Sequence, residues 1–248
     1  MSKEKKNLMI LGIIQARTGS SRLPGKIMMK IEGKTMLEHM IERISKSKKL
    51  DKIIIATTTK KNDDVITILA KKMNIDIFRG SENDVLDRYY NACEKYSANI
   101  VVRLSSDSPL LDGEIIDNVI EEYLSGNYDF VGTLAPQPRT FPDGLSVEVF
   151  SSKLLNYAQL NAKKLSDREH VTLYMLTQPH KFKIHRVDYE NDCSRYRFNL
   201  DYSEDFQLLK KIFKNFYPKN KHFKVNDVIQ WLENNPRIFE INNMSKSD

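Results

Sequence analysis

The chain has 248 residues, of which 40% are hydrophobic, and its formal net charge is +6. This length and apolar content suit one α/β domain with a sizeable core and exclude a low-complexity or disordered chain. No apolar stretch approaches a membrane span, and the two cysteines, Cys93 and Cys193, lack metal-ligand spacing, so we expect reduced thiols in a cytoplasmic protein.

The basic segment 1–6 and the apolar residues after it have the order of a secretion signal. The apolar run is too short, however, and no small-residue cleavage site follows it. The cations that come next suit a phosphate-binding loop better. We therefore interpret residues 8–15 as a buried strand.

Apolar runs then alternate with segments of helical periodicity. Strands are predicted over 8–15, 53–57, 75–78 and 100–104, and helices over 35–47, 63–73, 84–96 and 112–124. Thr35 and Glu38 form a capping box, and Asp112 is placed to cap the last of these helices. The alternation predicts parallel strands covered by helices, with ligands beyond the carboxyl ends of the strands. The loops after Gln15, Phe78 and Leu104 should therefore converge.

The second half of the chain is less regular. Strands are predicted over 128–132, 145–150, 181–188 and 195–201, and helices over 203–216 and 225–234. The strands 181–188 and 195–201 are candidates for antiparallel pairing. Because no Gly/Ser-rich linker occurs, we expect a single domain over residues 1–248.

The loop from Ala16 to Lys26 has two glycines, three hydroxyl side chains and three cations within eleven residues. A triphosphate needs close backbone N–H groups and positive side chains, and this composition supplies both. A solvated basic loop is the alternative. Its position directly after a buried strand favours phosphate binding.

Two other phosphate-binding motifs are excluded. Gly33-Lys34-Thr35 resembles the end of a P-loop, but the required earlier glycine is replaced by Met28. No Gly-x-Gly-x-x-Gly fingerprint occurs in the sequence.

Two aspartates follow predicted strands, Asp107 after 100–104 and Asp201 at the end of 195–201. Two such carboxylates suit Mg²⁺, which prefers carboxylate oxygens, water and substrate phosphates. A turn role for Asp107 and a helix N-cap role for Asp201 are the alternatives.

The segment Ile14-Gln-Ala-Arg-Thr-Gly-Ser-Ser-Arg-Leu-Pro-Gly-Lys26 resembles the signature of cytidylyltransferases that make CMP-activated acidic sugars, including CMP-Kdo and CMP-sialic acid synthetases. The strongest resemblance is to the group named after spore coat polysaccharide biosynthesis protein F. Further matching segments follow in order along the chain, at 78–90, 107–110, 141–150, 167–172 and 201–205.

This resemblance implies a glycosyltransferase-A-like α/β fold, with a mostly parallel mixed sheet between helices and a small antiparallel insertion. It implies a homodimer, CTP as donor, Mg²⁺ as cofactor, pyrophosphate as product and a small anionic sugar-type acceptor. Asp107 and Asp201 would hold the metal, and Arg17, Arg22, Lys26 and Asp107 would carry the catalysis. The nucleotide would be bound by Ala16, Arg17, Gly19, Ser20, Arg22, Lys26, Ser81, Arg88 and Ser106.

The acceptor pocket and dimer contacts are expected within residues 134–200. Its candidate residues come from two of the matching segments: Arg139, Asp143, Gly144, Glu148, Arg168, Glu169 and His170. Asp143 and Gly144 alternatively form a turn. Glu148 interrupts an apolar strand, so its carboxylate needs a partner such as Arg168 or the sugar hydroxyls.

One position departs from the resemblance. Relatives usually have glycine before the strand-end aspartate, where this chain has Ser106. A side chain at this position is expected to narrow the pocket or to redirect Asp107.

Two other functions account for part of the pattern. A nucleotide-sugar-dependent glycosyltransferase shares the fold class, but its usual Asp-x-Asp metal motif is absent. A basic nucleic-acid-binding protein would explain the net charge, but the lysines are dispersed and no zinc-finger or aromatic-basic motif occurs, so we expect no nucleic-acid partner.

Overall fold

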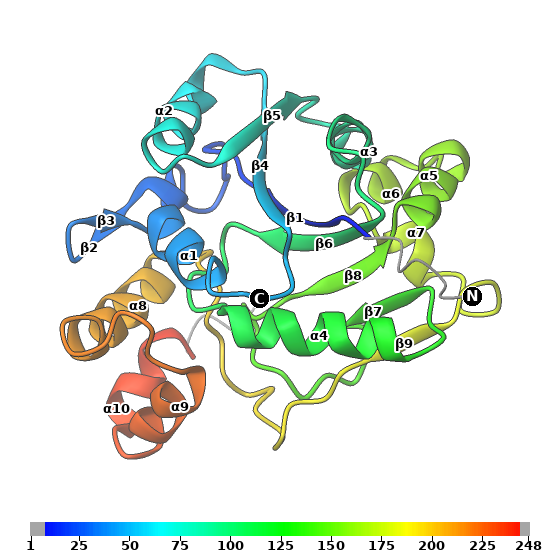
Figure 1. Ribbon diagram of the computed structural model, residues 1–248. Helices are drawn as coiled ribbons and strands as arrows, with labels where there is room; N and C mark the ends of the chain where they lie inside the picture. The colour runs from blue at the N-terminus through cyan, green and yellow to red at the C-terminus, as the bar shows by residue number, and fades with distance from the viewer. Residues whose placement is uncertain (1–7, 244–248) are drawn as a thin grey trace.

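The computed structural model describes residues 8–243, so the basic segment 1–6 lies outside the described residues (Figure 1). Its centre is a seven-stranded sheet in the order β5-β4-β1-β6-β8-β7-β9. The strands are β1 (Ile10–Gln15), β4 (Lys52–Thr58), β5 (Asp76–Gly80), β6 (Ile100–Ser105), β7 (Phe130–Gly132), β8 (Glu148–Ser151) and β9 (Ile184–Arg186).

The first four of these strands are parallel, as the alternating pattern predicts. β1 lies between β4 and β6, with Gln15 opposite Ala56 on one side and Ser105 on the other. β8 runs antiparallel to both β6 and β7, and β9 pairs with β7 in parallel. The fold is therefore a mostly parallel, mixed α/β sheet, and its polar loops follow the carboxyl ends of β1 and β6.

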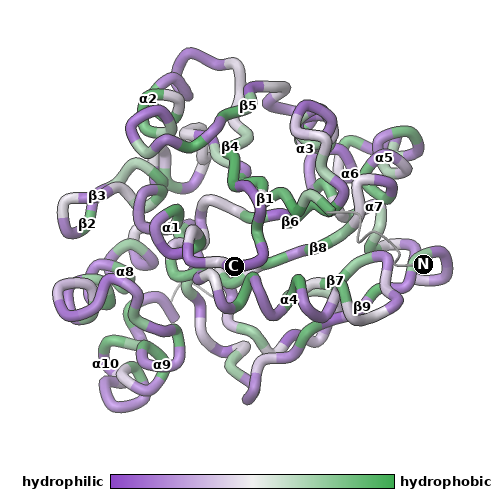
Figure 2. Tube along the Cα trace, viewed as in Figure 1, coloured by the Kyte–Doolittle hydropathy of each residue, from purple (hydrophilic) through white to green (hydrophobic). Residues whose placement is uncertain are grey.

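Helices cover both faces of the sheet. Alternate side chains of β1 face opposite layers, since Ile10 and Ile14 pack in one core cluster, and Leu11 and Ile13 in the other. The first cluster contains α1 (Met36–Ile44), α2 (Asp64–Lys72), α4 (Gly113–Ser125), α8 (Ser203–Phe216) and α9 (Val225–Glu233). The second contains α3 (Val85–Lys95), α5 (Ser152–Asn161) and α7 (Leu173–Leu176), with α6 (Leu165–Glu169) beside α3. Figure 2 shows apolar strands in the centre and hydrophilic outer helix faces.

The predicted helix caps are present. Thr35 and Glu38 form a complete capping box at the start of α1, and the Asp112 carboxylate accepts hydrogen bonds from Glu114 N and Ile115 N at the start of α4. Gly33-Lys34-Thr35 belongs to a small hairpin between β2 (Lys30–Ile31) and β3 (Lys34–Thr35), which is an antiparallel sheet rather than a phosphate loop.

The prediction for residues 181–201 is wrong in two respects. Only Ile184–Arg186 of the first segment forms a strand, and it pairs with β7. Residues 195–201 form a single bridge, between Arg197 and Asp143, instead of a strand. The segment is extended because backbone hydrogen bonds tie it to Asp143 and Asp107, including Leu200 N to Asp107 O at 2.8 Å.

The carboxyl-terminal helices pack as a layer beside α1. After α9 the chain continues through α10 (Pro236–Phe239) and the 3₁₀ helix η3 (Glu240–Asn242). Two further 3₁₀ helices occur earlier in the chain: η1 (Lys26–Met28), which contacts α1, and η2 (Lys61–Asp63), which contacts α2. Among residues 8–243, no helix combines the length and the apolar character needed to cross a membrane. Both cysteines are buried and unpaired.

Candidate active site

A cavity of about 300 Å³ opens at the carboxyl ends of β1 and β6. Its walls come from the loop after β1, the end of β6, the start of α3 and the end of α6. It also reaches Asp201 in the extended segment before α8. The predicted convergence of the loops after Gln15 and Leu104 is confirmed. The segment after Phe78 contributes through Val85 and Arg88 of α3.

Lys26 brings the two predicted metal-binding aspartates together. Its ammonium nitrogen lies 2.8 Å from Oδ1 of Asp201 and 3.4 Å from Oδ2 of Asp107. The Lys26 side chain is 11% exposed, so this contact is shielded from water. Two carboxylates and one cation therefore share a small, partly buried volume, where charge interactions are stronger than at an open surface.

Arg22 reaches the same carboxylates from the loop. Its Nη2 lies 3.3 Å from Oδ1 of Asp201, and its Nη1 donates a 3.2 Å hydrogen bond to the Tyr202 hydroxyl. That hydrogen bond and the nearby Asp201 raise the pKa of Arg22 above its ordinary value. The guanidinium thus stays charged while remaining half exposed to an incoming anion.

The loop that carries Arg22 and Lys26 is held in place by Asp63, which lies in the connection between β4 and α2. The Asp63 carboxylate, at the end of η2, accepts 2.7 Å hydrogen bonds from both the backbone N and the hydroxyl of Thr18. Its second oxygen accepts a hydrogen bond from the Thr58 hydroxyl. Gly25 closes the loop with a bond from its N to Thr18 O, and its φ of 70° favours glycine.

Asp201 is held by the first turn of α8. Asp205 accepts 2.9 Å hydrogen bonds from Asp201 N and Arg197 Nη2, and Asn199 donates to Asp201 Oδ2 at 2.7 Å. Asp201 is therefore not the N-cap of this helix, which is Tyr202. The Asn242 amide, from η3, donates to Asp205 Oδ1 and so supports the same turn.

Arg88 provides a buried cation on the opposite wall. It is 2% exposed, and its Nη1 donates to Ser81 O at 2.7 Å, while its Nε has no hydrogen-bond partner in the described part of the chain. Burial, together with repulsion from Arg17, lowers the pKa of Arg88. Arg17 and Arg88 both line the cavity, and the repulsion between these two cations favours an anion there.

Glu169 and His170 line the cavity from the end of α6. Their position depends on Arg168, whose Nη2 and Nε lie 2.6 Å and 2.9 Å from Oδ2 of Asp84, the N-cap of α3. Arg168 itself is not among the lining residues. The structure thus gives Arg168 a positioning contact with α3.

Glu148 pairs with Arg103, so the expected pairing with Arg168 is wrong. Arg103 Nη1 lies 2.7 Å from Oε2 of Glu148, and the Thr172 hydroxyl donates to the same oxygen at 3.0 Å. Arg103 and Glu148 lie opposite each other in the antiparallel pair of β6 and β8. Burial opposes the charge of Arg103, but Glu148 outweighs it and raises the pKa of Arg103. Arg103 also binds Oε1 of Gln15 and lines the cavity floor.

The other predicted residues divide into two groups. Within the cavity lining lie Ala16, Arg17, Gly19, Ser20 and Ser106. Outside it lie Ser81, Arg139, Asp143 and Gly144. Gly144 has a φ of 87°, and a Cβ there would meet Asn199 N at 2.2 Å, so this glycine lets the 143–144 turn pack against the segment that carries Asp201.

Comparison with known proteins shows the family to which the chain belongs. A sequence model described as cytidylyltransferase matches residues 11–241. The chain belongs to the cytidylyltransferase family. Its fold and its nucleotidyltransferase activity, with CTP as the nucleotide donor, follow from that membership.

Relatives in three organisms match this cytidylyltransferase over nearly their whole lengths. An uncharacterised protein of Methanocaldococcus jannaschii is 42% identical over 94% of both chains. The spore coat polysaccharide biosynthesis protein SpsF of Bacillus subtilis is 30% identical, over 92% of this chain and 95% of its own. The solved structure of a cytidylyltransferase from Leptospira borgpetersenii superposes with a TM-score of 0.89 at 35% identity, covering 94% and 97% of the two chains.

Several residues of the cytidylyltransferase site escape prediction from sequence. Gln15, Arg103 and Ser105 line the cavity, and Asp63 and Asp205 position its functional groups. For Arg103 the sequence does contain a signal that we did not use, a charged residue inside the otherwise apolar strand 100–104. Asp63 has no such signal, because an aspartate at the start of a predicted helix is ordinary.

Proposed function

We propose that this protein transfers CMP from CTP to a small acidic or phosphorylated sugar and releases pyrophosphate, in the synthesis of surface polysaccharide or glycoconjugate. The observation that carries the proposal is the contact of Lys26 with both Asp107 and Asp201 beside a loop of further cations. The similarity to the spore coat polysaccharide protein supports the polysaccharide context. The homodimer and the cytoplasmic location inferred from the sequence are part of this proposal.

Asp107 and Asp201 fit a divalent ion. Among residues 8–243 no group of three or more histidine, cysteine or acidic side chains forms a complete metal cage. Mg²⁺ does not need one, since it is commonly held by one or two carboxylates plus water and substrate phosphates. Bound at these two carboxylates, Mg²⁺ would supply charge neutralisation at the phosphates and at the attacking oxygen.

The side chains of the loop then act on the triphosphate. Arg17, Arg22 and Lys26 are placed to offset the charge of the departing pyrophosphate, since all three line the cavity. Lys26 is the group that must change partner in this scheme, because its ammonium contacts both carboxylates. Transfer to the β- and γ-phosphates would free those carboxylates for the metal.

The acceptor is assigned to the wall opposite these cations. Arg88, Glu169 and His170 line that wall, together with the Arg103 side chain at the floor. Arg88 was expected at the nucleotide, but its Nη1 bonds only a backbone oxygen and its Nε has no hydrogen-bond partner among the described residues, so we reassign it to a carboxylate or phosphate on the sugar. Glu169 and His170 supply hydrogen-bonding groups for the hydroxyls.

A pyrophosphate-release assay tests the proposal. Purified protein with Mg²⁺ and CTP should release pyrophosphate when an acidic or phosphorylated sugar from a panel is added. UTP and GTP should give little release. An Asp107→Asn variant serves as the control for contaminating phosphatases and should be inactive with every acceptor. Release with UTP or GTP in place of CTP would contradict the assignment, as would equal release by the Asp107→Asn variant.

A further inference from the structure

A second cavity, of about 570 Å³, lies where the end of α1, the start of α4 and the connection between α8 and α9 meet. It shares no lining residue with the active-site cavity. Its cationic side chains come from two separate parts of the chain, the end of α1 with the residues after it and the connection between α8 and α9. They are Arg43, Lys46, Lys48, Lys49 and Lys224, with His222 beside them.

Arg43 is the buried cation of this cavity. It is 2% exposed, its Nε and Nη2 donate to Leu110 O at 3.2 Å and 2.9 Å, and its guanidinium stacks 4.4 Å from the Phe223 ring centre. Its Nη1 has no hydrogen-bond partner in the described chain. The nearest carboxylate, that of Asp112, is 3.8 Å from Nη2 and already caps α4. The charge of Arg43 is therefore only partly compensated, and burial lowers its pKa to about 10.

The acidic residues around the cavity pair directly with only two of the four lysines. Lys49 and Lys224 form ion pairs with Glu121 and Glu114, respectively. The Asp117 carboxylate accepts backbone hydrogen bonds from Lys48 N and Lys49 N rather than an ammonium group.

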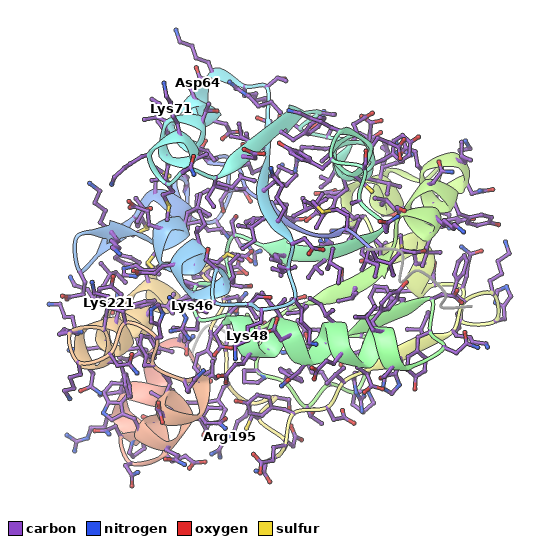
Figure 3. All side chains as sticks on the ribbon, in the orientation of Figure 1. Lys46, Lys48, Asp64, Lys71, Arg195 and Lys221 are labelled. Carbon is purple, nitrogen blue, oxygen red and sulfur yellow. The ribbon has the colours of Figure 1, made fainter. Side chains whose placement is uncertain are left out.

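Two ammonium groups are left over. Within the described residues, Lys46 and Lys48 form no ion pair, and both are exposed; Figure 3 shows them near the start of α4. Five cationic side chains and four carboxylates line this cavity, so its formal excess is one positive charge, and Lys46 and Lys48 are the ammonium groups available to a ligand.

His222 is a second side chain of this cavity with a buried nitrogen that lacks a partner. Its Nδ1 is buried without a hydrogen-bond partner in the described residues. Burial lowers its pKa, Lys46 lowers it further, Glu42 acts in the opposite direction, and Arg43 and Lys221 add smaller lowering effects. Two of the unpartnered buried nitrogens of this structure thus belong to side chains that line one cavity.

We propose that this second cavity binds a phosphate-type oxyanion through Lys46 and Lys48, with Arg43 and His222 supplying positive charge and a hydrogen-bond donor behind them. Such an anion would pair with the two ammonium groups that have no carboxylate partner in the described chain, and its several acceptor oxygens match the available donors. The anion is either free phosphate or pyrophosphate, or the phosphoryl group of a small metabolite. The proposal is independent of the chemistry assigned to the first cavity.

Histidine NMR locates the anion, because the chain has five histidines and one lines each cavity. His222 reports the second cavity, and His170 reports the active site. A His222→Gln variant assigns the His222 ring signal. Inorganic phosphate, pyrophosphate and glycerol phosphate are titrated separately at constant ionic strength. The first two represent a free anion, and the third a phosphomonoester.

Binding should shift the His222 signal in a saturable way and raise its pKa, because the anion offsets the surrounding cations. The Lys46→Ala/Lys48→Ala double variant should bind at least about tenfold more weakly, since two charge-assisted contacts are lost. Both lysines are exposed, so the variant should fold normally. Lys71→Ala, a matched exposed lysine on α2, should bind as the unmodified protein does (Figure 3).

Two results would overturn the proposal. In the first, His170 responds to the anions but His222 does not, which would place all binding in the active site. In the second, the double variant and Lys71→Ala respond alike, which would show unspecific attraction to a basic surface.

Discussion

The ammonium nitrogen of Lys26 lies 2.8 Å from Oδ1 of Asp201, across 175 residues of sequence. The same nitrogen reaches Asp107 at 3.4 Å. One lysine therefore occupies the space between the two carboxylates to which we assign Mg²⁺. Its contacts hold two like charges together, and in the proposed reaction it faces the triphosphate.

Replacing this lysine should separate the two roles. We expect Lys26→Met to slow CMP transfer by at least about 100-fold, since a preorganised charged contact contributes roughly 3 kcal/mol to the transition state. Metal binding without nucleotide should become tighter, because no ammonium competes for Asp107 and Asp201. Mn²⁺ titration followed by electron paramagnetic resonance measures the second effect. Lys30→Ala, an exposed lysine of the neighbouring hairpin, is the control. A near-normal transfer rate in Lys26→Met would refute the catalytic role.

Asp63 should prove important for both stability and nucleotide affinity. Asp63→Asn removes one acceptor from the set that holds Thr18 and Thr58, so we expect a loss of about 1–3 kcal/mol in the free energy of unfolding. The Michaelis constant for CTP should rise, because the loop loses its anchor. Asp64→Asn is the matched control, since Asp64 is half exposed in a surface ion pair worth at most about 1 kcal/mol. Equal effects of the two substitutions would contradict the anchoring role.

The stability supplied by Asp63 should also depend on pH. Burial alone would raise its pKa, but hydrogen bonds from Thr58 and Thr18 outweigh burial and lower it below the ordinary value of 3.8. A group whose pKa is lowered by folding stabilises the protein above its unfolded pKa, and this contribution is lost as the pH falls through the folded value. Urea unfolding at pH 5 and pH 3 should therefore show a smaller acid-induced loss in Asp63→Asn than in the unmodified protein. An identical loss would contradict the prediction.

The pair of Arg103 and Glu148 should be sensitive to the loss of one partner. Their side chains are 18% and 10% exposed, so Glu148→Gln leaves a largely buried cation without its counter-charge. We expect this to cost about 3–5 kcal/mol of unfolding free energy. The double variant Arg103→Met/Glu148→Met should recover much of that loss, as apolar replacements of buried ion pairs commonly do. If Glu148→Gln changed only the Michaelis constant of the acceptor, Glu148 would be a substrate ligand instead.

Local patterns predicted the parts of this fold that local physics determines. The strand ending at Gln15 and the cap at Asp112 follow from apolar runs and from side-chain hydrogen bonds within a few residues. The pairing of β9 with β7 could not be predicted from such local patterns, because register across a sheet depends on partners that are distant in sequence. The helix α5 was not predicted either, because it begins directly after β8 at the Ser151 cap, without a glycine or proline to mark the change.

The same distinction applies to the site. Arg22, Lys26 and Asp107 were predicted because their loops follow strands that end at one edge of the sheet. The partner of Glu148 was not predicted, since Arg103 is its neighbour only through the antiparallel register of β6 and β8. Asp63 and Asp205 act through backbone contacts with Thr18 and Asp201, and such contacts leave no residue pattern in the sequence.

Ser106 offers a test of what a side chain directly before Asp107 does to the site. It is 7% exposed, lines the cavity, and directly precedes Asp107, while its backbone N donates to Gln15 O at 3.1 Å. Removing the hydroxymethyl group in Ser106→Gly should widen the cavity next to the carboxylate. We expect the preference for CTP over UTP, measured as the ratio of kcat/KM values, to fall several-fold. The cost in stability should be about 0.5–1 kcal/mol, from the added backbone freedom of glycine. Ser108→Gly is the matched control, because Ser108 is buried in the same segment but does not line the cavity. An equal change of preference in both variants would show that backbone freedom, rather than the Ser106 side chain, sets the selectivity.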